Sequence, residues 1–199
     1  MIDTIIFDIG NVLVDFRWKE FIKSFGYSDE VNERVARASV LDPDWNEYDR
    51  GNLTEEEILD LFVENDPGVE KEIRTIYADF SKGLLKQKDY AKPWIRELKE
   101  HGFKVYYLSN FSYKAEHECA GELDFIPLTD GGILSYKVKM IKPDPAIYKL
   151  LAQMYDLDPA NCLFFDDTPV NVEAARNCGF NAEVFNSYSQ ACEKIESLK

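Results

Sequence analysis

Polar side chains follow three short apolar runs of the sequence, and each run is typical of a buried strand. Asp8 comes directly after the first run, Ser109 and Asn110 after the second, and Asp166 and Asp167 after the third. Taken singly, each group has a structural explanation, because turns favour serine and asparagine and an aspartate can cap a following helix. Ligands bind beyond the carboxyl ends of parallel strands. If the three runs share one sheet, these side chains meet in a single cleft.

A lysine between the second and third groups would complete the set. Lys142 lies in the segment Lys142-Pro143-Asp144-Pro145, and by itself it could be a solvated loop charge. Clustered carboxylates repel one another unless a cation lies between them, and Mg²⁺ prefers oxygen ligands that include carboxylates and a substrate phosphate. Beside Mg²⁺, Asp8 would stay ionised and could attack phosphorus to form an aspartyl-phosphate. Lys142 would help to offset the charge on the phosphoryl oxygens.

The order of the predicted elements indicates how these residues are positioned. From residue 92 onward strands alternate with helices, which is typical of a parallel sheet with helices on both faces. Residues 17–90 are charged and show helical periodicity without a strand pattern, and Thr54 with Glu57 gives a capping-box signal. We therefore expect an α/β, Rossmann-like core of residues 1–15 and 92–199, with an inserted all-helical cap domain of residues 16–91. The cap would follow the first strand and lie over the site.

Less regular patterns occur in the second half of the chain. We expect a short strand at 124–128, a turn at Gly131-Gly132, a hairpin arm at 133–140 and a last helix at 187–198. The turn is predicted because glycine pairs favour turns.

The bulk composition narrows the classes of partner. The chain of 199 residues carries a net charge of −14 and has a pI of about 4.6. Such an acidic surface repels phosphate backbones and anionic lipids, so we expect no nucleic-acid or membrane partner. The four cysteines show no paired spacing, and no secretory signal or membrane-spanning run is evident, which together indicate reduced thiols and a cytoplasmic location. The sequence gives no indication of the oligomeric state.

Four segments resemble, in order, the motifs of the haloacid dehalogenase-like hydrolase superfamily: 7–13, 108–110, 142–144 and 165–171. The resemblance spans nearly the whole chain, and the helical block is similar to the superfamily's small helical cap, which contacts the substrate. The Gly10-Asn11 pair and the segment 48–54 resemble the group that contains a bacterial α-glucose-1-phosphate phosphatase and the amino-terminal phosphatase domain of soluble epoxide hydrolases. This implies a magnesium-dependent phosphatase of a small phosphorylated metabolite, with a sugar phosphate favoured.

The resemblance also implies a metal site. Asp8 would be both the nucleophile and a Mg²⁺ ligand, and Gly10 would offer its backbone carbonyl to the metal. Asp167 would bind Mg²⁺, and Asp166 would bind it directly or through water. Asn171 would support these ligands from the first turn of the following helix.

Substrate contacts are implied in both parts of the chain. In the core, Ser109 and Asn110 would hold the phosphoryl group beside Lys142. Specificity would come from the cap, where the candidate contacts are Tyr48, Arg50, Trp18 and Trp45. These aromatic side chains could instead pack the core of the cap, and the arginine could pair with a surface carboxylate.

Gly10 departs from the superfamily's pattern. Many phosphatases of this superfamily carry an aspartate two residues after the nucleophile, and such general acid–base help is typically worth ~10²–10⁴-fold in rate. With Gly10 there, we expect either a substrate with a good leaving group, such as a sugar 1-phosphate, or a proton supplied by a cap residue or by water.

Three other functions compete with this interpretation. A haloacid dehalogenase would use Asp8 without a metal, and the Asp166-Asp167 pair argues against it. A non-catalytic binding protein on the same scaffold would explain Gly10 as decay, but Asp8 and Lys142 remain in place. A phospho-receiver domain also uses an acidic cluster and a lysine, but it is shorter and lacks the helical insert.

Overall fold

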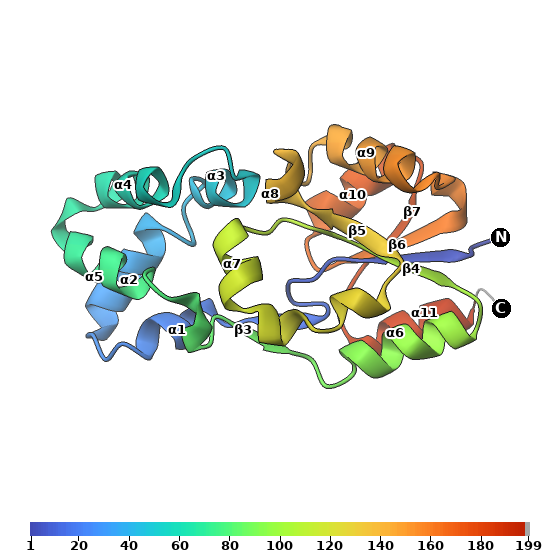
Figure 1. Cartoon of the computed structure of the whole chain (residues 1–199), viewed down its shortest axis with the longest axis horizontal. Coiled ribbons are helices and arrows are strands. Elements are labelled where there is room, and N and C mark those ends of the chain that lie inside the picture. Colours follow the sequence, from blue (N-terminus) through green and yellow to red (C-terminus); the bar gives the residue numbers. More distant parts are fainter. Residues whose placement is uncertain (198–199) are drawn as a thin grey trace.

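The core is a five-stranded parallel sheet with the strand order β5-β4-β1-β6-β7. It is seen in a computed structural model of the chain, which describes residues 1–197. The strands are β1 (Thr4–Phe7), β4 (Lys104–Ser109), β5 (Gly131–Leu134), β6 (Cys162–Asp166) and β7 (Asn181–Val184). Figure 1 shows this sheet in one half of the molecule, with both termini at its outer end. The predicted α/β fold is therefore confirmed.

Helices cover both faces of the sheet, and β1 shows why. Ile5 and Phe7 pack into one apolar cluster and Ile6 into another, because successive side chains of a strand point to opposite faces. The first cluster is completed by α6 (Ala91–Glu100) and α11 (Tyr188–Glu196), and the second by α9 (Pro145–Tyr155) and α10 (Pro169–Asn177). The apolar run of β1 is thus continuous because both of its faces are buried.

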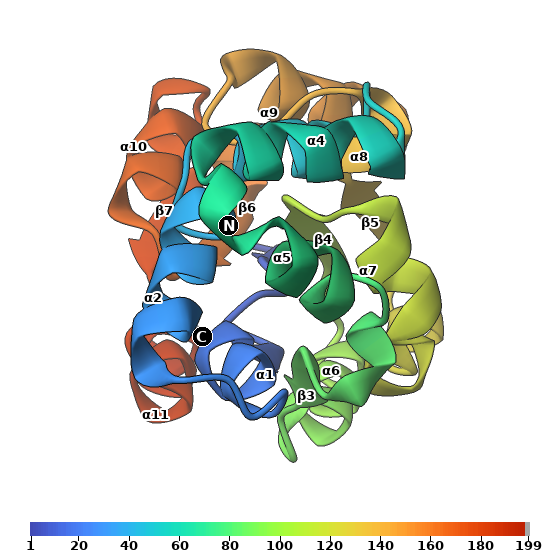
Figure 2. The same ribbon diagram turned by 90° about the vertical axis from the view of Figure 1, so that its left-hand side faces the viewer.

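The inserted block forms the other half of the molecule, and Figure 2 views it end-on. Its helices are α1 (Trp18–Lys23), α2 (Asp29–Ala38), α3 (Trp45–Arg50), α4 (Glu55–Asn65) and α5 (Glu70–Ile76). The predicted capping box is present at α4, where Thr54 N–H donates to Glu57 Oε2 at 2.7 Å and Glu57 N–H donates to Thr54 Oγ1 at 3.3 Å. Aromatic rings, among them Phe62, Tyr77 and Phe80, fill the interior of the cap.

The prediction that residues 17–90 contain no strand is wrong. β3 (Leu85–Gln87) pairs antiparallel with β2 (Val14–Phe16), so the chain entering the cap and the chain leaving it form a two-stranded sheet. Three residues are too few to show an alternating pattern. This strand exists because of its partner, which lies about 70 residues away in sequence.

Three details of the second half also differ from expectation. Residues 124–128 form no strand but the end of a pair of 3₁₀ turns, η3 (Ala120–Leu123) and η4 (Ile126–Leu128). Gly131 and Gly132 lie in β5 and not in a turn, and no hairpin arm follows, because the chain enters α8 (Ser135–Val138). Position 132 requires glycine because β5 and β4 approach each other closely there: a Cβ would lie 2.4 Å from the backbone oxygen of Tyr107.

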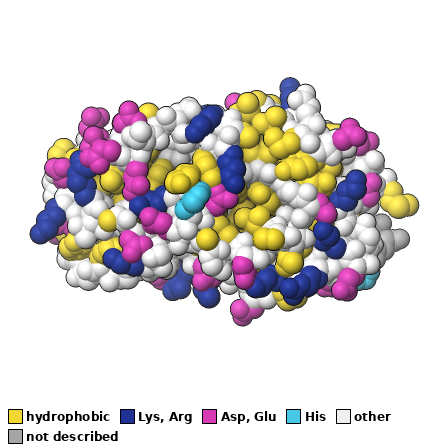
Figure 3. All heavy atoms as spheres, in the orientation of Figure 1, with side chains coloured by type: hydrophobic (Ala, Val, Ile, Leu, Met, Phe, Trp, Pro, Cys, Tyr) yellow, Lys and Arg dark blue, Asp and Glu magenta, His cyan; other side chains and the backbone are white. Residues whose placement is uncertain are grey.

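The remaining helix of the core is α7 (Tyr113–Glu118), which lies between the sheet and the cap. The last helix ends at Glu196, and the predicted end at Leu198 falls outside the described residues. Within residues 1–197, no helix combines the length and the apolar character needed to cross a membrane. Acidic and basic side chains are interspersed over both halves of the face in Figure 3.

Candidate active site

The carboxyl ends of the three central strands bring the predicted polar groups together. Because β4, β1 and β6 are neighbours in the sheet, the residues after each strand lie at one edge. Lys142 reaches this edge from the loop before α9, and its Nζ lies 2.9 Å from Asp8 Oδ1 and 2.6 Å from Asp166 Oδ2. The lysine is 2% exposed and Asp166 is fully buried. Lys142 is therefore a buried cation between two carboxylates and not a solvated loop charge.

Asp8 is held through one of its two oxygens. Its Oδ1 accepts a hydrogen bond from Ile9 N–H at 2.7 Å and faces the Lys142 ammonium. The backbone N–H of Asp8 donates to the Phe165 carbonyl at 2.8 Å, which fixes the residue to the end of β6. The carboxylate is thus oriented, and its Oδ2 is the oxygen that neither of these groups holds.

Asp166 is surrounded by donors on both oxygens. Besides Lys142, it accepts from Asn171 Nδ2 at 3.1 Å on each oxygen and from Thr168 N–H at 2.8 Å on Oδ1. Tyr148 in turn donates to the Asn171 backbone carbonyl at 2.9 Å. Asn171 therefore contacts Asp166, and its support of a metal site stays a prediction.

Asp167 is less buried and has a partner that sequence reasoning missed. Asn11 Nδ2 donates to Asp167 Oδ2 at 2.9 Å, while Asn11 Oδ1 accepts from Phe16 N–H at 3.2 Å. Asn11 has a φ of 55°, a backbone conformation that asparagine tolerates better than most residues. The Gly10-Asn11 turn was a signal for the local contact with Phe16 N–H, because asparagine in a turn often bonds nearby backbone groups, but it gave none for the contact with Asp167.

These acidic groups could together hold a metal ion. Oxygens of Asp8, Asp166 and Asp167 lie within 4.8 Å of one another. Carboxylate oxygens are the ligands that Mg²⁺ and other hard cations prefer. The donor set therefore fits a hard divalent cation.

Charge and burial set the protonation of the network. Burial raises the pKa of Asp8 to about 7; Lys142 opposes this rise and Asp166 adds to it. Burial by itself lowers the pKa of Lys142, but Asp8 and Asp166 outweigh it and hold that pKa above its ordinary value. A cation among the carboxylates would oppose the rise at Asp8 in the same way as the lysine does.

The second strand contributes a hydroxyl and a clamp. Ser109 is the last residue of β4 and is 1% exposed, and its side chain lowers the pKa of Asp8 by hydrogen bonding. Asn110 Oδ1 accepts from Lys142 N–H at 2.7 Å, and its Nδ2 donates to the Lys142 carbonyl at 2.9 Å. The side chain of Asn110 thus fixes the loop that carries the lysine.

Comparison with known proteins agrees with this geometry. Residues 2–179 match the family described as haloacid dehalogenase-like hydrolase. The chain belongs to this family. It is 28% identical to a protein named phosphatase MT3486 from Mycobacterium tuberculosis, over 98% of this chain and 92% of that protein. It is also 24% identical to drimenol cyclase drtB from Aspergillus calidoustus, but spans only 37% of the length of that protein.

Solved structures show the same fold. A HAD family enzyme, bt-2542 from Bacteroides thetaiotaomicron, determined in complex with magnesium and inorganic phosphate, superposes with a TM-score of 0.72 at 23% identity. The match covers 96% of this chain and 99% of that one. This HAD-like hydrolase therefore has the family's architecture over nearly its whole length.

The cap candidates lie in different places. Tyr48 is 7% exposed, contacts the rings of Phe62 and Phe80, and borders a cavity of about 480 Å³ between α3, α7 and α8. Arg50 Nε donates to Glu47 at 3.2 Å, and Trp18 lies in a groove between α1 and α2. The structure does not bring these three candidates to Gly10.

A small pocket of about 80 Å³ does adjoin Gly10, and Trp45 is one of its walls. The cap residue that brings a charge to it is Asp49, which stands between Tyr48 and Arg50 on α3. Neighbouring residues of a helix point in directions about 100° apart, so the choice among 48, 49 and 50 depends on how the cap is seated. Sequence periodicity had no signal for that.

Proposed function

We propose that this HAD-like hydrolase is a Mg²⁺-dependent phosphatase of a small phosphorylated metabolite, with a sugar phosphate favoured. The observation that carries the proposal is the oriented, buried Asp8, which lies against Lys142 and within one acidic cluster with Asp166 and Asp167. A site with a nucleophilic carboxylate, a fixed cation and room for a hard metal ion suits phosphoryl transfer.

Asp8 acts as the nucleophile through Oδ2. Oδ1 is already engaged by Ile9 N–H and Lys142, so Oδ2 forms the bond to phosphorus as the ester oxygen leaves. The product is an aspartyl-phosphate, which water then hydrolyses to free phosphate and Asp8. The phosphoryl oxygens are stabilised by Lys142, the Ser109 hydroxyl and the Asn110 backbone N–H. Asn110 uses its backbone because its side chain already bonds the loop that carries Lys142.

A bound Mg²⁺ would supply charge for the phosphoryl group and reduce the repulsion between Asp8 and the anionic ester. The residues that would hold it are Asp8, Asp167 and the backbone carbonyl of Gly10. Asp166 already accepts from Lys142, Asn171 and Thr168. We therefore place it behind the metal, in contact through water.

The same cluster favours a phosphatase over a dehalogenase. Displacement of halide by a carboxylate needs no divalent cation, and a halogenated acid brings no phosphate to share one. Three carboxylates within 4.8 Å make sense where a hard cation is bound during the reaction. The likeness to a relative named as a phosphatase supports this choice.

The test is release of phosphate from a panel of esters, sugar phosphates first, with Mg²⁺ and with EDTA, and release of chloride from 2-chloropropionate in parallel. We expect phosphate release with Mg²⁺ only, and loss on the order of 10⁴-fold or more in Asp8→Asn. Asp89→Asn, at an exposed carboxylate, is the matched control and should keep its activity.

Metal binding is measured independently by thermal unfolding. Mg²⁺ at 100 times its Kd should stabilise the wild type by about 2.7 kcal/mol, and Asp167→Asn should lose most of this gain. If the wild type binds Mg²⁺ but hydrolyses no ester of the panel, the proposed phosphatase function is wrong.

A further inference from the structure

Gly10 provides no acid or base to the site, and close packing does not require glycine at this position. A Cβ built at this position meets no atom within 4 Å, and the backbone is not in the left-handed region that favours glycine. A side chain would therefore fit, and a pocket of about 80 Å³ adjoins both Gly10 and Asn110, which lie just beyond β1 and β4 and follow Asp8 and Ser109 closely in sequence. The proton then has to come from another residue or from water, unless the leaving group needs none.

Asp49 is the only titratable residue among the described residues that line this pocket. The other walls are apolar or neutral, and they include Trp45, Phe111 and Asn110. Within residues 1–197 Asp49 accepts a hydrogen bond through its backbone carbonyl, and no hydrogen bond or ion pair engages its carboxylate. The carboxylate is thus available to a ligand, in contrast to that of Asp166, which accepts hydrogen bonds on both oxygens.

The position of Asp49 is fixed by the core and does not depend on the cap alone. Ser135 Oγ donates to the Asp49 backbone carbonyl at 2.6 Å and accepts from Phe111 N–H at 2.8 Å, so one buried hydroxyl joins α3 to the loop after β4. At the end of α3, a Cβ on Gly51 would lie 2.8 Å from Tyr136 Cβ, which shows how closely α3 and α8 approach each other. The backbone of Asp49 is therefore held in place, with the residue lining the pocket beside Gly10.

The electrostatic setting suits a group that both gives and takes a proton. Burial raises the pKa of Asp49 to about 7, the charge of Asp8 adds to this rise, and Lys142 opposes it. Two cations close to Asp49 in sequence or after α8 are engaged elsewhere, since Arg50 bonds Glu47 and Lys139 bonds the Gly51 carbonyl. A general acid–base works best when its pKa lies near the operating pH.

We propose that Asp49 is the general acid and base of this enzyme and takes the place of the carboxylate that Gly10 lacks. As Asp8 Oδ2 bonds phosphorus and the ester P–O bond breaks, the Asp49 carboxyl gives its proton to the leaving oxygen, which departs as an alcohol. Asp49, now ionised, takes a proton from the water that attacks the aspartyl-phosphate, so that the Asp8–phosphorus bond breaks and the starting state returns. This inference rests on the proposed phosphatase function.

The experiment compares two classes of ester in Asp49→Asn. With an alkyl or sugar phosphate whose leaving group needs a proton, single-turnover release of the alcohol should fall ~10²–10⁴-fold. With 4-nitrophenyl phosphate, whose phenolate leaves without one, release should fall less than ~10-fold, and the phosphorylated enzyme should accumulate and be visible by mass spectrometry. Glu47→Gln, on the same helix but paired with Arg50, is the control and should change neither.

A second variant separates chemistry from structure. Since the position of Gly10 has room for a side chain, Gly10→Asp in the Asp49→Asn background should restore at least ~10-fold of the lost rate on the unactivated ester. A structural role for Asp49 would give no such rescue. Equal losses on both esters, or no loss on either, would overturn the assignment of Asp49 while the phosphatase function stands; if the wild type hydrolyses neither ester with Mg²⁺, both proposals fall.

Discussion

The strand edge of the core and the part of the cap that faces it differ in how their charged side chains are paired. At the strand edge, Lys142 is 2% exposed and bonds two carboxylates, and both oxygens of Asp166 accept hydrogen bonds. On the cap face, Asp49 presents a carboxylate without a partner among residues 1–197. Under the proposed function this difference is a division of labour, in which the core would hold the phosphoryl group and the cap would offer a carboxyl group to the leaving group.

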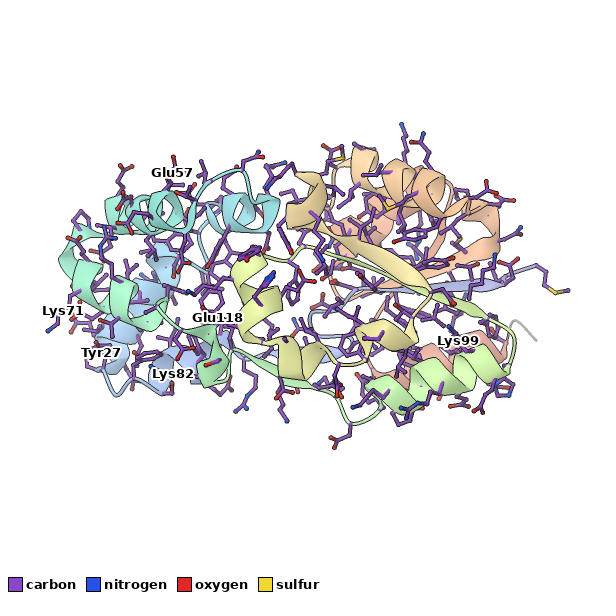
Figure 4. The ribbon with its side chains drawn as sticks, viewed as in Figure 1. Tyr27, Glu57, Lys71, Lys82, Lys99 and Glu118 are labelled. Atoms are coloured by element: carbon purple, nitrogen blue, oxygen red, sulfur yellow. The ribbon has the colours of Figure 1, made fainter. Side chains whose placement is uncertain are left out.

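Charged side chains link the two halves beside apolar residues that form one cluster across both. Lys114 of α7 contacts Glu55 of the cap at 2.6 Å and Glu118 of its own helix at 2.9 Å, while Phe80 N–H donates to Glu118 at 2.6 Å. Figure 4 shows Glu118 where α7 faces the cap. Lys114 is buried, but Glu55 and Glu118 are partly exposed, so water can replace part of these contacts, whereas the buried network at the strand edge has no such substitute. The stability of the two regions should therefore respond differently to the loss of one partner.

The largest effect is expected from Lys142→Met in the core. Removal of this cation leaves Asp8 and Asp166 buried and unpaired, which should lower the free energy of unfolding by about 3–5 kcal/mol. The measurement is urea unfolding in EDTA, so that no metal replaces the lysine. Lys99→Met is the control, because Lys99 bonds Asp130 at 2.7 Å with both side chains about a third exposed, and it should cost about 0–1 kcal/mol. Similar losses in the two variants would remove the contrast between strand edge and surface.

A smaller loss is expected where the two regions meet. Ser135 is fully buried and joins the Asp49 carbonyl to Phe111 N–H. Ser135→Ala leaves that N–H without its partner and should cost about 1–3 kcal/mol, and it should lower kcat on unactivated esters more than on 4-nitrophenyl phosphate by displacing Asp49. Ser24→Ala removes an exposed hydroxyl that donates to the Phe21 carbonyl at 2.7 Å and should leave both quantities nearly unchanged. A variant that loses stability but treats both esters alike would show that Ser135 does not position Asp49.

The difference between strand edge and cap also explains how much of the site could be predicted from the sequence. Asp8, Ser109 and Asp166 were predicted to share a site because each follows an apolar run, and the sheet places their strands side by side. This signal is local, since strand ends in a parallel sheet meet at one edge whatever the rest of the chain does. The clustering of Lys142 with them follows from the loop that Asn110 holds, which only the folded chain reveals.

The cap gave no equivalent signal. Tyr48 and Arg50 were predicted to face the site because of their chemistry, but Asp49 between them is the residue that borders the pocket beside Gly10. Which face of a short helix points inward depends on its seating against α8, and this is set by distant contacts such as the one from Ser135 to the Asp49 carbonyl. β3 was missed for the same reason, because its pairing with β2 is long-range.

The smallest expected effect is the contribution of Asp49 to the pH dependence of the free energy of unfolding. Its pKa is about 7 in the folded protein against 3.8 for an ordinary aspartate, so between these values the folded state binds more protons than the unfolded chain, and stability falls as the pH rises. Asp49→Asn removes this titration. The variant should be as stable as the wild type near pH 4 and more stable by about 1–2 kcal/mol at pH 8. This difference is smaller than ~1.4 kcal/mol for every unit by which the pKa is raised, because the carboxylate is partly exposed.

Urea unfolding in EDTA across this range measures the difference, and Asp89→Asn, at an exposed position, should stay within ~0.5 kcal/mol of the wild type at every pH. A gap between Asp49→Asn and the wild type that does not grow with pH would mean that Asp49 is solvated or paired in the folded protein. The cap would then offer no free carboxylate, and the leaving group would have to depart without a proton from the enzyme. A gap that grows through neutral pH means instead that the fold tolerates a destabilising carboxylate at this point, as expected where a group is retained for catalysis at the expense of stability.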